Sequence, residues 1–203
     1  MRCAGVTVLG CALLAAGLSP AFAGPWARGE GDGFVSLQIS AEEAPVDISA
    51  GLWEPESYTS LYAEYGLGRS FTIGADLGGG DTAQQGVVFL RYTLTEPEAD
   101  WQFAIDAGVG LRRVEGADDA TLLRIGASIG RGFGPGDGSW PMPLEHEGGW
   151  LTVDALAYYD LDAGDVIWQV EGTAGLRFSD RFAGLFQVKV EEWPGADLLV
   201  SIA

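Results

Sequence analysis

Hydrophobic and polar residues alternate along most of the chain after Gly33, and this alternation is the main structural signal in the sequence. Residues 101–112 are the clearest example, because large or small apolar side chains occupy every second position from Trp101 to Leu111. A period of two is typical of β-strands with one apolar and one polar face. The same windows place charges on every side of a helical wheel, so a helical interpretation fails.

We predict an all-β, antiparallel, up-and-down fold of about ten strands from this pattern. Most of the strands contain 8 to 13 residues, which is longer than the usual strand of about 5–6. This length is close to the ~9–11 residues that a tilted strand needs to cross a bilayer. The predicted strands are 33–40, 57–66, 70–78, 85–94, 101–112, 121–131, 149–160, 166–178, 181–191 and 197–203.

The apolar face carries no charged residue in the interior of any of these segments. The charged residues that fall on the polar face are Glu64, Asp76, Arg91, Asp106, Arg112, Arg124, Asp154, Glu171, Arg177, Lys189 and Glu191. In a soluble sandwich the polar face would be outside and the apolar face would meet a second sheet. In an outer-membrane barrel the apolar face meets lipid and the polar face lines the lumen. Since unpaired charges in a narrow lumen are costly, we expect paired networks, for example Asp106 with Arg91 or Arg124.

Aromatic residues favour the barrel. If the first strand runs outward from the periplasm, one group of aromatics falls on the apolar face at the periplasmic end and a second group falls at the opposite end. The first group is Tyr65, Phe71, Tyr92, Trp101, Phe178 and Phe182, and the second is Tyr159 and Trp168. Amphipathic rings at these two levels are expected where a barrel meets the membrane interfaces.

The N-terminus predicts export. Residues 1–23 combine a basic Arg2, an apolar core and a small-x-small site ending at Ala23, which is typical of a cleaved signal peptide. Both cysteines leave with this segment, so the remaining domain, 24–203, contains no disulfide. A lipoprotein box at Cys11 is disfavoured because the apolar run before it is short. The net charge of −18 argues against nucleic-acid binding.

With its signal peptide, long amphipathic strands, aromatic girdles and absence of later cysteines, the chain resembles the small Gram-negative outer-membrane β-barrels. The resemblance covers 24–203 and implies membrane lipid and the outer-membrane assembly machinery as partners. The last segment, 197–203, is short and has no terminal aromatic. We therefore expect the parent gene to continue to about twelve strands, and the strand 33–40 to pair poorly with 197–203.

The sequence gives only weak support for a metal site, a hydrolase or peptidase active site, or a calcium loop. His146 lies between two glutamates but is better explained as a solvated loop, and its periplasmic position disfavours a Ser–His hydrolase. Acidic residues near the outer rim, such as Asp119 and Asp160, could support a peptidase but are common in soluble loops. The glycine-rich runs 29–33 and 78–81 lack the spaced carboxylates of a calcium loop and predict turns.

The sequence therefore predicts a non-enzymatic outer-membrane barrel without a cofactor, structural or passing small solutes, with a narrow charge-paired lumen. Two alternatives stay open: a barrel enzyme that hydrolyses lipid or peptide, and a soluble secreted β-barrel that binds an apolar ligand.

Overall fold

The computed structural model describes residues 6–8, 24–42, 56–80, 83–116, 118–135, 147–179, 182–192 and 199–202. Within these ranges no helix is long and apolar enough to cross a membrane. The strands are β1 (Val6–Val8), β2 (Gly33–Glu42), β3 (Glu56–Gly68), β4 (Phe71–Gly80), β5 (Ala83–Thr93), β6 (Trp101–Val114), β7 (Ala120–Phe133), β8 (Gly149–Asp160), β9 (Val166–Ser179), β10 (Phe182–Glu192) and β11 (Leu199–Ile202).

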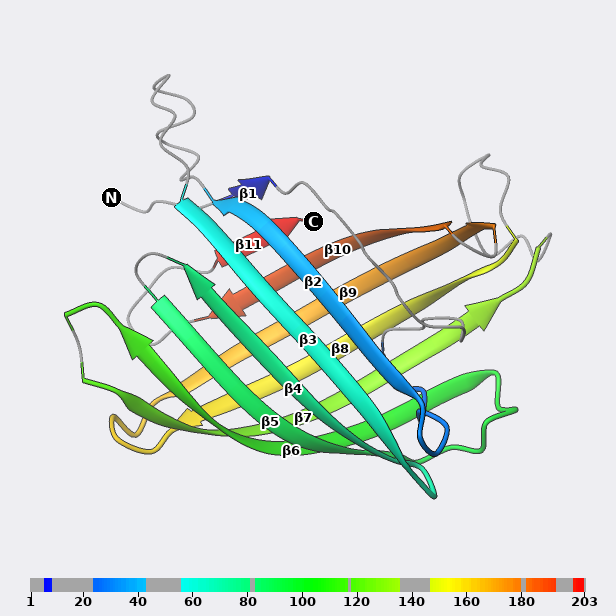
Figure 1. Cartoon of the computed structure of the whole chain (residues 1–203), viewed down its shortest axis with the longest axis horizontal. Helices are drawn as coiled ribbons and strands as arrows, with labels where there is room; N and C mark the ends of the chain where they lie inside the picture. Colours follow the sequence, from blue (N-terminus) through cyan, green and yellow to red (C-terminus); the bar gives the residue numbers. More distant parts are fainter. Residues whose placement is uncertain are drawn as a thin grey trace.

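Nine long strands, β2 to β10, form one antiparallel sheet in which each strand pairs with its neighbour in the sequence. The sheet curls into a half-barrel (Figure 1). The predicted all-β, antiparallel, up-and-down arrangement is thereby confirmed at this level. Every predicted segment coincides with a strand, and the boundaries differ by at most two residues.

One turn prediction is wrong. The run Gly78-Gly79-Gly80, expected to be a turn, is the end of β4 and pairs with residues 58–60 of β3. Strand pairing with a neighbour can hold glycines in extended conformation even though their intrinsic strand propensity is low. By contrast, the run 29–33 does contain a turn, in which the Asp32 amide donates to the Gly29 carbonyl at 3.0 Å and Gly31 has a positive φ of 84°.

The connection between β3 and β4 is a tight hairpin. Arg69 and Ser70 join the two strands with positive φ angles of 52° and 68°. Two residues with positive φ give the twist of a type I′ turn, which matches the twist of the flanking strands. The predicted strands 57–66 and 70–78 leave only a short connection between them, and the structure has one at this position.

Two short strands complete the order of the sheet. β11 pairs antiparallel with β10, and β1 pairs parallel with β11 and also contacts β2. β2 is the last strand at the other end, and the described residues contain no ladder between β2 and β11. β1 belongs to the segment predicted as a signal peptide, whose removal stays a prediction.

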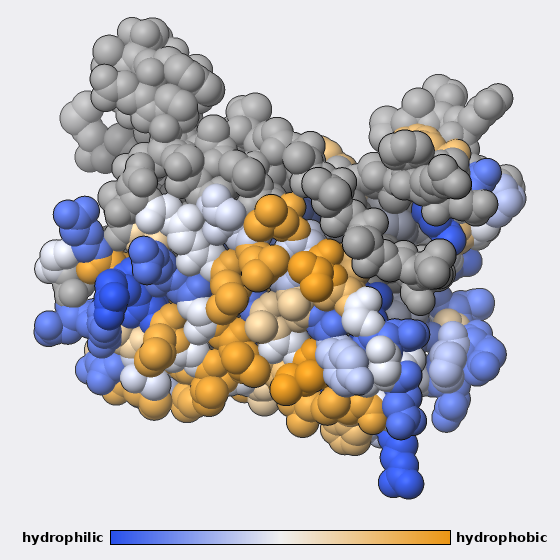
Figure 2. Space-filling view, in the orientation of Figure 1, coloured by the Kyte–Doolittle hydropathy of each residue, from blue (hydrophilic) through white to orange (hydrophobic). Residues whose placement is uncertain are grey.

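The two faces of the sheet differ in polarity. The concave face is buried and carries most of the charged strand residues, whereas the convex face exposes large apolar side chains. Figure 2 shows such an apolar surface over the strands, with hydrophilic residues on both sides of it. The buried interior of this sheet therefore contains apolar and polar side chains in similar numbers, and its buried charged groups lie on the concave face.

Candidate functional site

A network of ion pairs crosses the concave face over β3 to β7. Arg91 donates through Nη1 to Glu64 Oε1 at 2.6 Å, and its Nη2 lies 3.8 Å from Asp106 Oδ2. Arg124 donates through Nε to Asp106 Oδ1 at 2.8 Å, and its Nη1 lies 4.0 Å from Asp76. The structure thus brings five of the predicted charged residues into one chain of contacts. Asp106 contacts both arginines that we considered for it.

Phe89 of β5 forms the floor of this network. The guanidinium carbons of Arg124 and Arg91 lie 4.2 and 5.3 Å from its ring centroid, within the range of cation–π attraction. The ring has room because Gly74 of β4 carries no side chain, and a Cβ there would overlap the ring. The network therefore rests on an aromatic ring that this glycine accommodates.

Two further carboxylates lie on β8 and β9. Asp154 and Glu171 are directly opposite each other in the register, and Glu171 is opposite Lys189 of β10. Ser128 donates to Asp154 at 2.5 Å, and the Gln187 amide donates to Glu171 at 3.0 Å. Hydroxyl and amide groups therefore donate hydrogen bonds to these carboxylates, whereas guanidinium groups donate to Glu64 and Asp106.

The remaining predicted residues lie nearer the strand ends. Arg112 is half-buried near the end of β6, and Arg177 is half-buried near the end of β9. Glu191 belongs to β10, but its side chain lies outside the described residues. The predicted network therefore includes a group of contacting residues in the middle of the sheet, and Arg112 and Arg177 lie nearer its rims.

Residues 24–32, for which the sequence predicted only the turn at 29–33, cover part of the concave face. The carbonyl of Gly24 accepts a hydrogen bond from Arg91 Nη1 at 2.8 Å, and that of Pro25 accepts from the Thr93 hydroxyl at 2.8 Å. Arg28 donates through Nε to Glu64 Oε2 at 2.6 Å. The segment thus adds a third arginine to the network. The sequence analysis did not find this contact because hydrophobic and polar residues do not alternate in the segment.

A small apolar cluster also occupies the concave face, toward the other rim. It consists of Val87, Leu122, Leu156, Tyr158 and Ile167, all of which are at most 8% exposed. The signal that could have found it is a run of apolar doublets, since two adjacent apolar residues in a strand put one on each face. Leu122-Leu123 and Tyr158-Tyr159 are such doublets.

The predicted interface aromatics lie on the convex face near the rims. Tyr65, Phe71, Tyr92 and Trp101 come from the ends of β3 to β6 that meet at one rim, and Phe178 ends β9 at the same rim. Phe71 and Tyr92 are opposite in the register with ring centroids 4.8 Å apart. Tyr159 and Trp168 lie near the other rim, 42% and 55% exposed. Phe182 begins β10, and its side chain lies outside the described residues.

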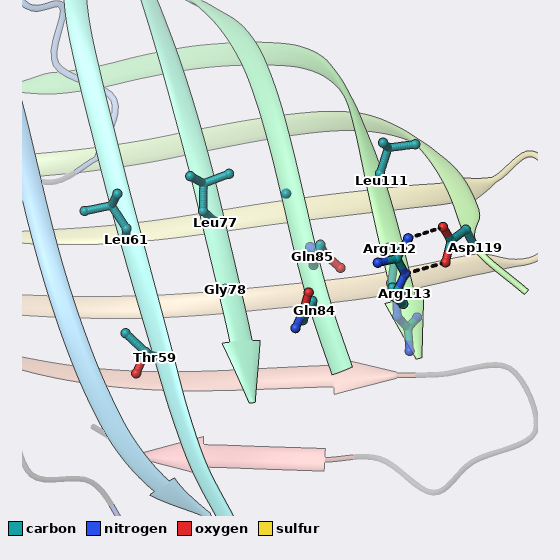
Figure 3. Close-up of a pocket in the computed structure, with 11 residues that line it drawn as sticks. Thr59, Leu61, Leu77, Gly78, Gln84, Gln85, Leu111, Arg112, Arg113 and Asp119 are labelled. Atoms are coloured by element: carbon teal, nitrogen blue, oxygen red, sulfur yellow. Dashed lines mark hydrogen bonds and ion pairs between the residues drawn. The ribbon is translucent and has the colours of Figure 1, made fainter. Parts of the chain in front are cut away.

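A hollow of about 410 Å³ lies near the rim formed by the ends of β4 and β6. Leu61, Leu77 and Leu111 contribute to its lining, and the Arg113–Asp119 ion pair lies at one side (Figure 3). The two hydrogen bonds from the Arg113 guanidinium lower the pKa of Asp119. This pair is well exposed, with side chains 68% and 56% accessible.

The other candidate residues give no catalytic arrangement in the part of the chain that the structure describes. Asp160 accepts hydrogen bonds from the amides of Asp162 and Ala163 in the β8–β9 turn, and Asp162 accepts one from the amide of Thr121 in β7, so both have a structural role. No group of three or more His, Cys, Asp or Glu side chains in the described ranges could hold a metal ion. His146 lies outside those ranges.

The concave face therefore offers buried, mutually compensated charges, with an N-terminal segment at one end and apolar side chains at the other. No family model, curated protein or solved structure matches this chain.

Proposed function

We propose that this protein is an outer-membrane β-barrel with a filled, charge-paired lumen, which acts as a structural element or passes small solutes and is not an enzyme. The observation that carries the proposal is the inverted polarity of the sheet. Ile105 is 49% exposed and the next residue, Asp106, is 6% exposed. Arg124 is 3% exposed and the next residue, Ile125, is 63% exposed. In water, charged side chains would be expected outside and apolar ones inside. In a bilayer, apolar side chains face the lipid and polar ones face the interior, as they do here.

The extent of the apolar surface supports a lipid environment. Exposed Val, Leu, Ile and aromatic side chains occur on all nine strands from β2 to β10. Soluble monomers rarely expose contiguous apolar patches larger than a few hundred Å². The transfer of apolar surface out of water is favourable by about 25 cal/mol per Å². Contact of a surface that extends over nine strands with lipid is therefore strongly favourable.

The dimensions of the strands support the same proposal. β2 to β10 contain 10 to 14 residues each, which meets the ~9–11 residues that a tilted membrane strand needs. Aromatic side chains at both rims of the convex face are in the position where membrane interfaces favour them. The edge of β2 that faces away from β3 has no ladder within the described residues. Because lipid does not accept unpaired backbone groups, the proposal includes a pairing partner for this edge.

The proposed location is the outer membrane, reached by export through the predicted signal peptide and insertion by the outer-membrane assembly machinery. Membrane lipid is then the main partner of the convex face. A filled interior supports a structural role or the passage of small solutes, because the buried side chains leave little room for a wide water-filled channel.

Membrane fractionation tests this proposal. We expect the protein in the outer-membrane fraction, extractable only with detergent, and migrating faster on a gel before heating than after it. Recovery in the soluble periplasm without detergent would contradict the proposal. Lipase and peptidase assays on the folded protein test the non-enzymatic part, and a turnover that follows the protein through purification would overturn it.

A further inference from the structure

The segment Gly24–Asp32 crosses the concave face at one rim. Gly24 and Pro25 lie against β8, β7 and β5, since a Cβ at Gly130 of β7 would meet Pro25 and Trp26 at 3.0 and 2.8 Å. The Arg28 amide donates to the Thr72 hydroxyl of β4 at 3.2 Å. Near its end the segment pairs with β3, where the Gly31 amide donates to the Gly66 carbonyl at 3.1 Å.

Within this segment, the Arg28 side chain occupies a site made by two other strands. Its Nε donates to Glu64 Oε2 at 2.6 Å, and its guanidinium carbon lies 4.8 Å from the centroid of the Phe34 ring. The Arg28 side chain is 9% exposed and that of Glu64 is fully buried. A buried carboxylate beside an aromatic ring is a combination that attracts a planar organic cation.

We propose that Glu64 and Phe34 form a binding site for guanidinium compounds, and that the segment Gly24–Asp32 is a tethered stopper whose Arg28 fills this site. The site itself is independent of the membrane proposal, whereas the role of the stopper in closing one mouth of the lumen rests on it. A soluble guanidinium compound therefore binds only when Arg28 has left the site.

Two other groups fix the carboxylate in place. Arg91 donates to Glu64 Oε1 at 2.6 Å, and the Tyr62 hydroxyl donates to the same oxygen at 2.5 Å. Oε2 then remains directed at Arg28. Because Arg91 and Tyr62 belong to the strands, removal of Arg28 leaves the carboxylate oriented and partly compensated. The site is thus preorganised for a second cation.

The segment also covers the charged residues behind it. Ser128 is the next concave-face residue after Gly130 on β7, it is 5% exposed, and it contacts Asp154. Pro25 and Trp26 lie over Gly130 and therefore stand between this rim and Ser128. Displacement of the segment should open a path from the rim to this residue.

Calorimetric titration of the detergent-folded protein with N-propylguanidinium tests the site. We expect Arg28→Ala to bind this probe about tenfold or more tightly than the parent, in which the tethered side chain competes for the same site. The matched control is Arg113→Ala, because Arg113 also contacts a carboxylate but is exposed and has no ring contact in the described structure. The control should bind no better than the parent. Adding Phe34→Leu to Arg28→Ala should weaken the binding several-fold.

A second variant covers the case in which Arg28→Ala does not fold. A Cβ at Gly66 would lie on the carbonyl oxygens of Gly29 and Arg28, so Gly66→Ala should displace the segment and leave Glu64 and Phe34 in place. Gly172→Ala is its control, because nothing lies within 4 Å of that Cβ position. With Cys3 and Cys11 replaced by serine, Ser128→Cys should react with a water-soluble thiol reagent about tenfold faster in Gly66→Ala than in Gly172→Ala.

The site proposal is overturned if neither Arg28→Ala nor Gly66→Ala binds the probe better than its control, or if Phe34→Leu leaves the gained binding unchanged. The stopper is overturned if the thiol at position 128 reacts at the same rate in both glycine variants. These measurements are made in detergent, so their failure is distinct from a failure of the membrane proposal, which fractionation of the parent protein tests.

Discussion

Asp106 and Arg124 are joined by a diagonal ion pair between β6 and β7, in which the guanidinium Nε donates to Oδ1 at 2.8 Å. The residue directly opposite Asp106 is Gly126, and Arg124 lies two positions from it along β7. A Cβ at Gly126 would lie 2.6 Å from Asp106 Oδ2. The glycine therefore gives the carboxylate the space it needs to reach the arginine, and the charge pair depends on a residue that carries no charge.

Removal of this carboxylate should destabilise the fold strongly. Asp106→Asn leaves Arg124, whose side chain is 2% exposed, without its closest anionic partner. Breaking a buried ion pair in this way costs about 3–5 kcal/mol. Urea unfolding in detergent, followed by tryptophan fluorescence, measures the loss. Asp119→Asn is the control, since it breaks an exposed pair and should leave the unfolding free energy unchanged. Equal effects of the two variants would contradict the buried network.

The packing of Phe89 leads to a second prediction. A Cβ at Gly74, which is opposite Phe89 in the register, would overlap the ring. The ring cannot easily move away because Arg124 and Tyr62 lie against it. Gly74→Ala should therefore lower the unfolding free energy by about 1–3 kcal/mol, the usual cost of overpacking. Gly172→Ala should be neutral, and a neutral result for Gly74→Ala would show that the interior is loosely packed.

The sequence predicted the strands well because each strand has unlike faces. Alternation is a local property, and in residues 101–112 it determines both the extended conformation and the direction of every side chain. The same rule put Asp106, Arg91 and Arg124 on one face, and the structure brings them into contact. The face of the sheet on which each charged side chain lies could therefore be derived from the sequence. Which residue it pairs with on the neighbouring strand, as in the diagonal pair of Asp106 and Arg124, depends on the register.

Two features of the interior could not be derived from alternation. Arg28 belongs to a segment rich in glycine and proline, which has no period, and its partner Glu64 is distant in the sequence. The apolar cluster was hidden because Leu122 and Tyr158 occupy positions of the polar face. Both features depend on contacts between segments that are far apart in the chain, and no local pattern specifies those contacts.

The charge-paired lumen that we propose predicts a low conductance. Ion pairs occupy the middle of the concave face, Leu122 and Tyr158 are buried toward one rim, and the segment around Arg28 covers the other. A planar-bilayer recording of the folded protein should show no large steady current. Conductance of the size seen in open general porins would contradict the filled lumen, although it would leave the membrane location intact.

The convex face should not accept a charge within its apolar surface. Ile105 is 49% exposed on this face and lies opposite Tyr92 and Ala127. If this surface faces lipid, Ile105→Arg should make the free energy of insertion into vesicles less favourable by up to about 2–4 kcal/mol, the range for an arginine at the midplane. The same change would be neutral on a surface that faces water.

The control for that prediction is the adjacent residue. Ala104 is 2% exposed and faces the interior opposite Ser128, so Ala104→Ser adds a hydroxyl where polar groups already lie. We expect this variant to fold and insert like the parent, as read from the heat-modifiable band on a gel. If Ile105→Arg inserts normally while Ala104→Ser does not, the two faces of the sheet are reversed with respect to the membrane. If both variants insert normally, the prediction that the convex face meets lipid at Ile105 is wrong.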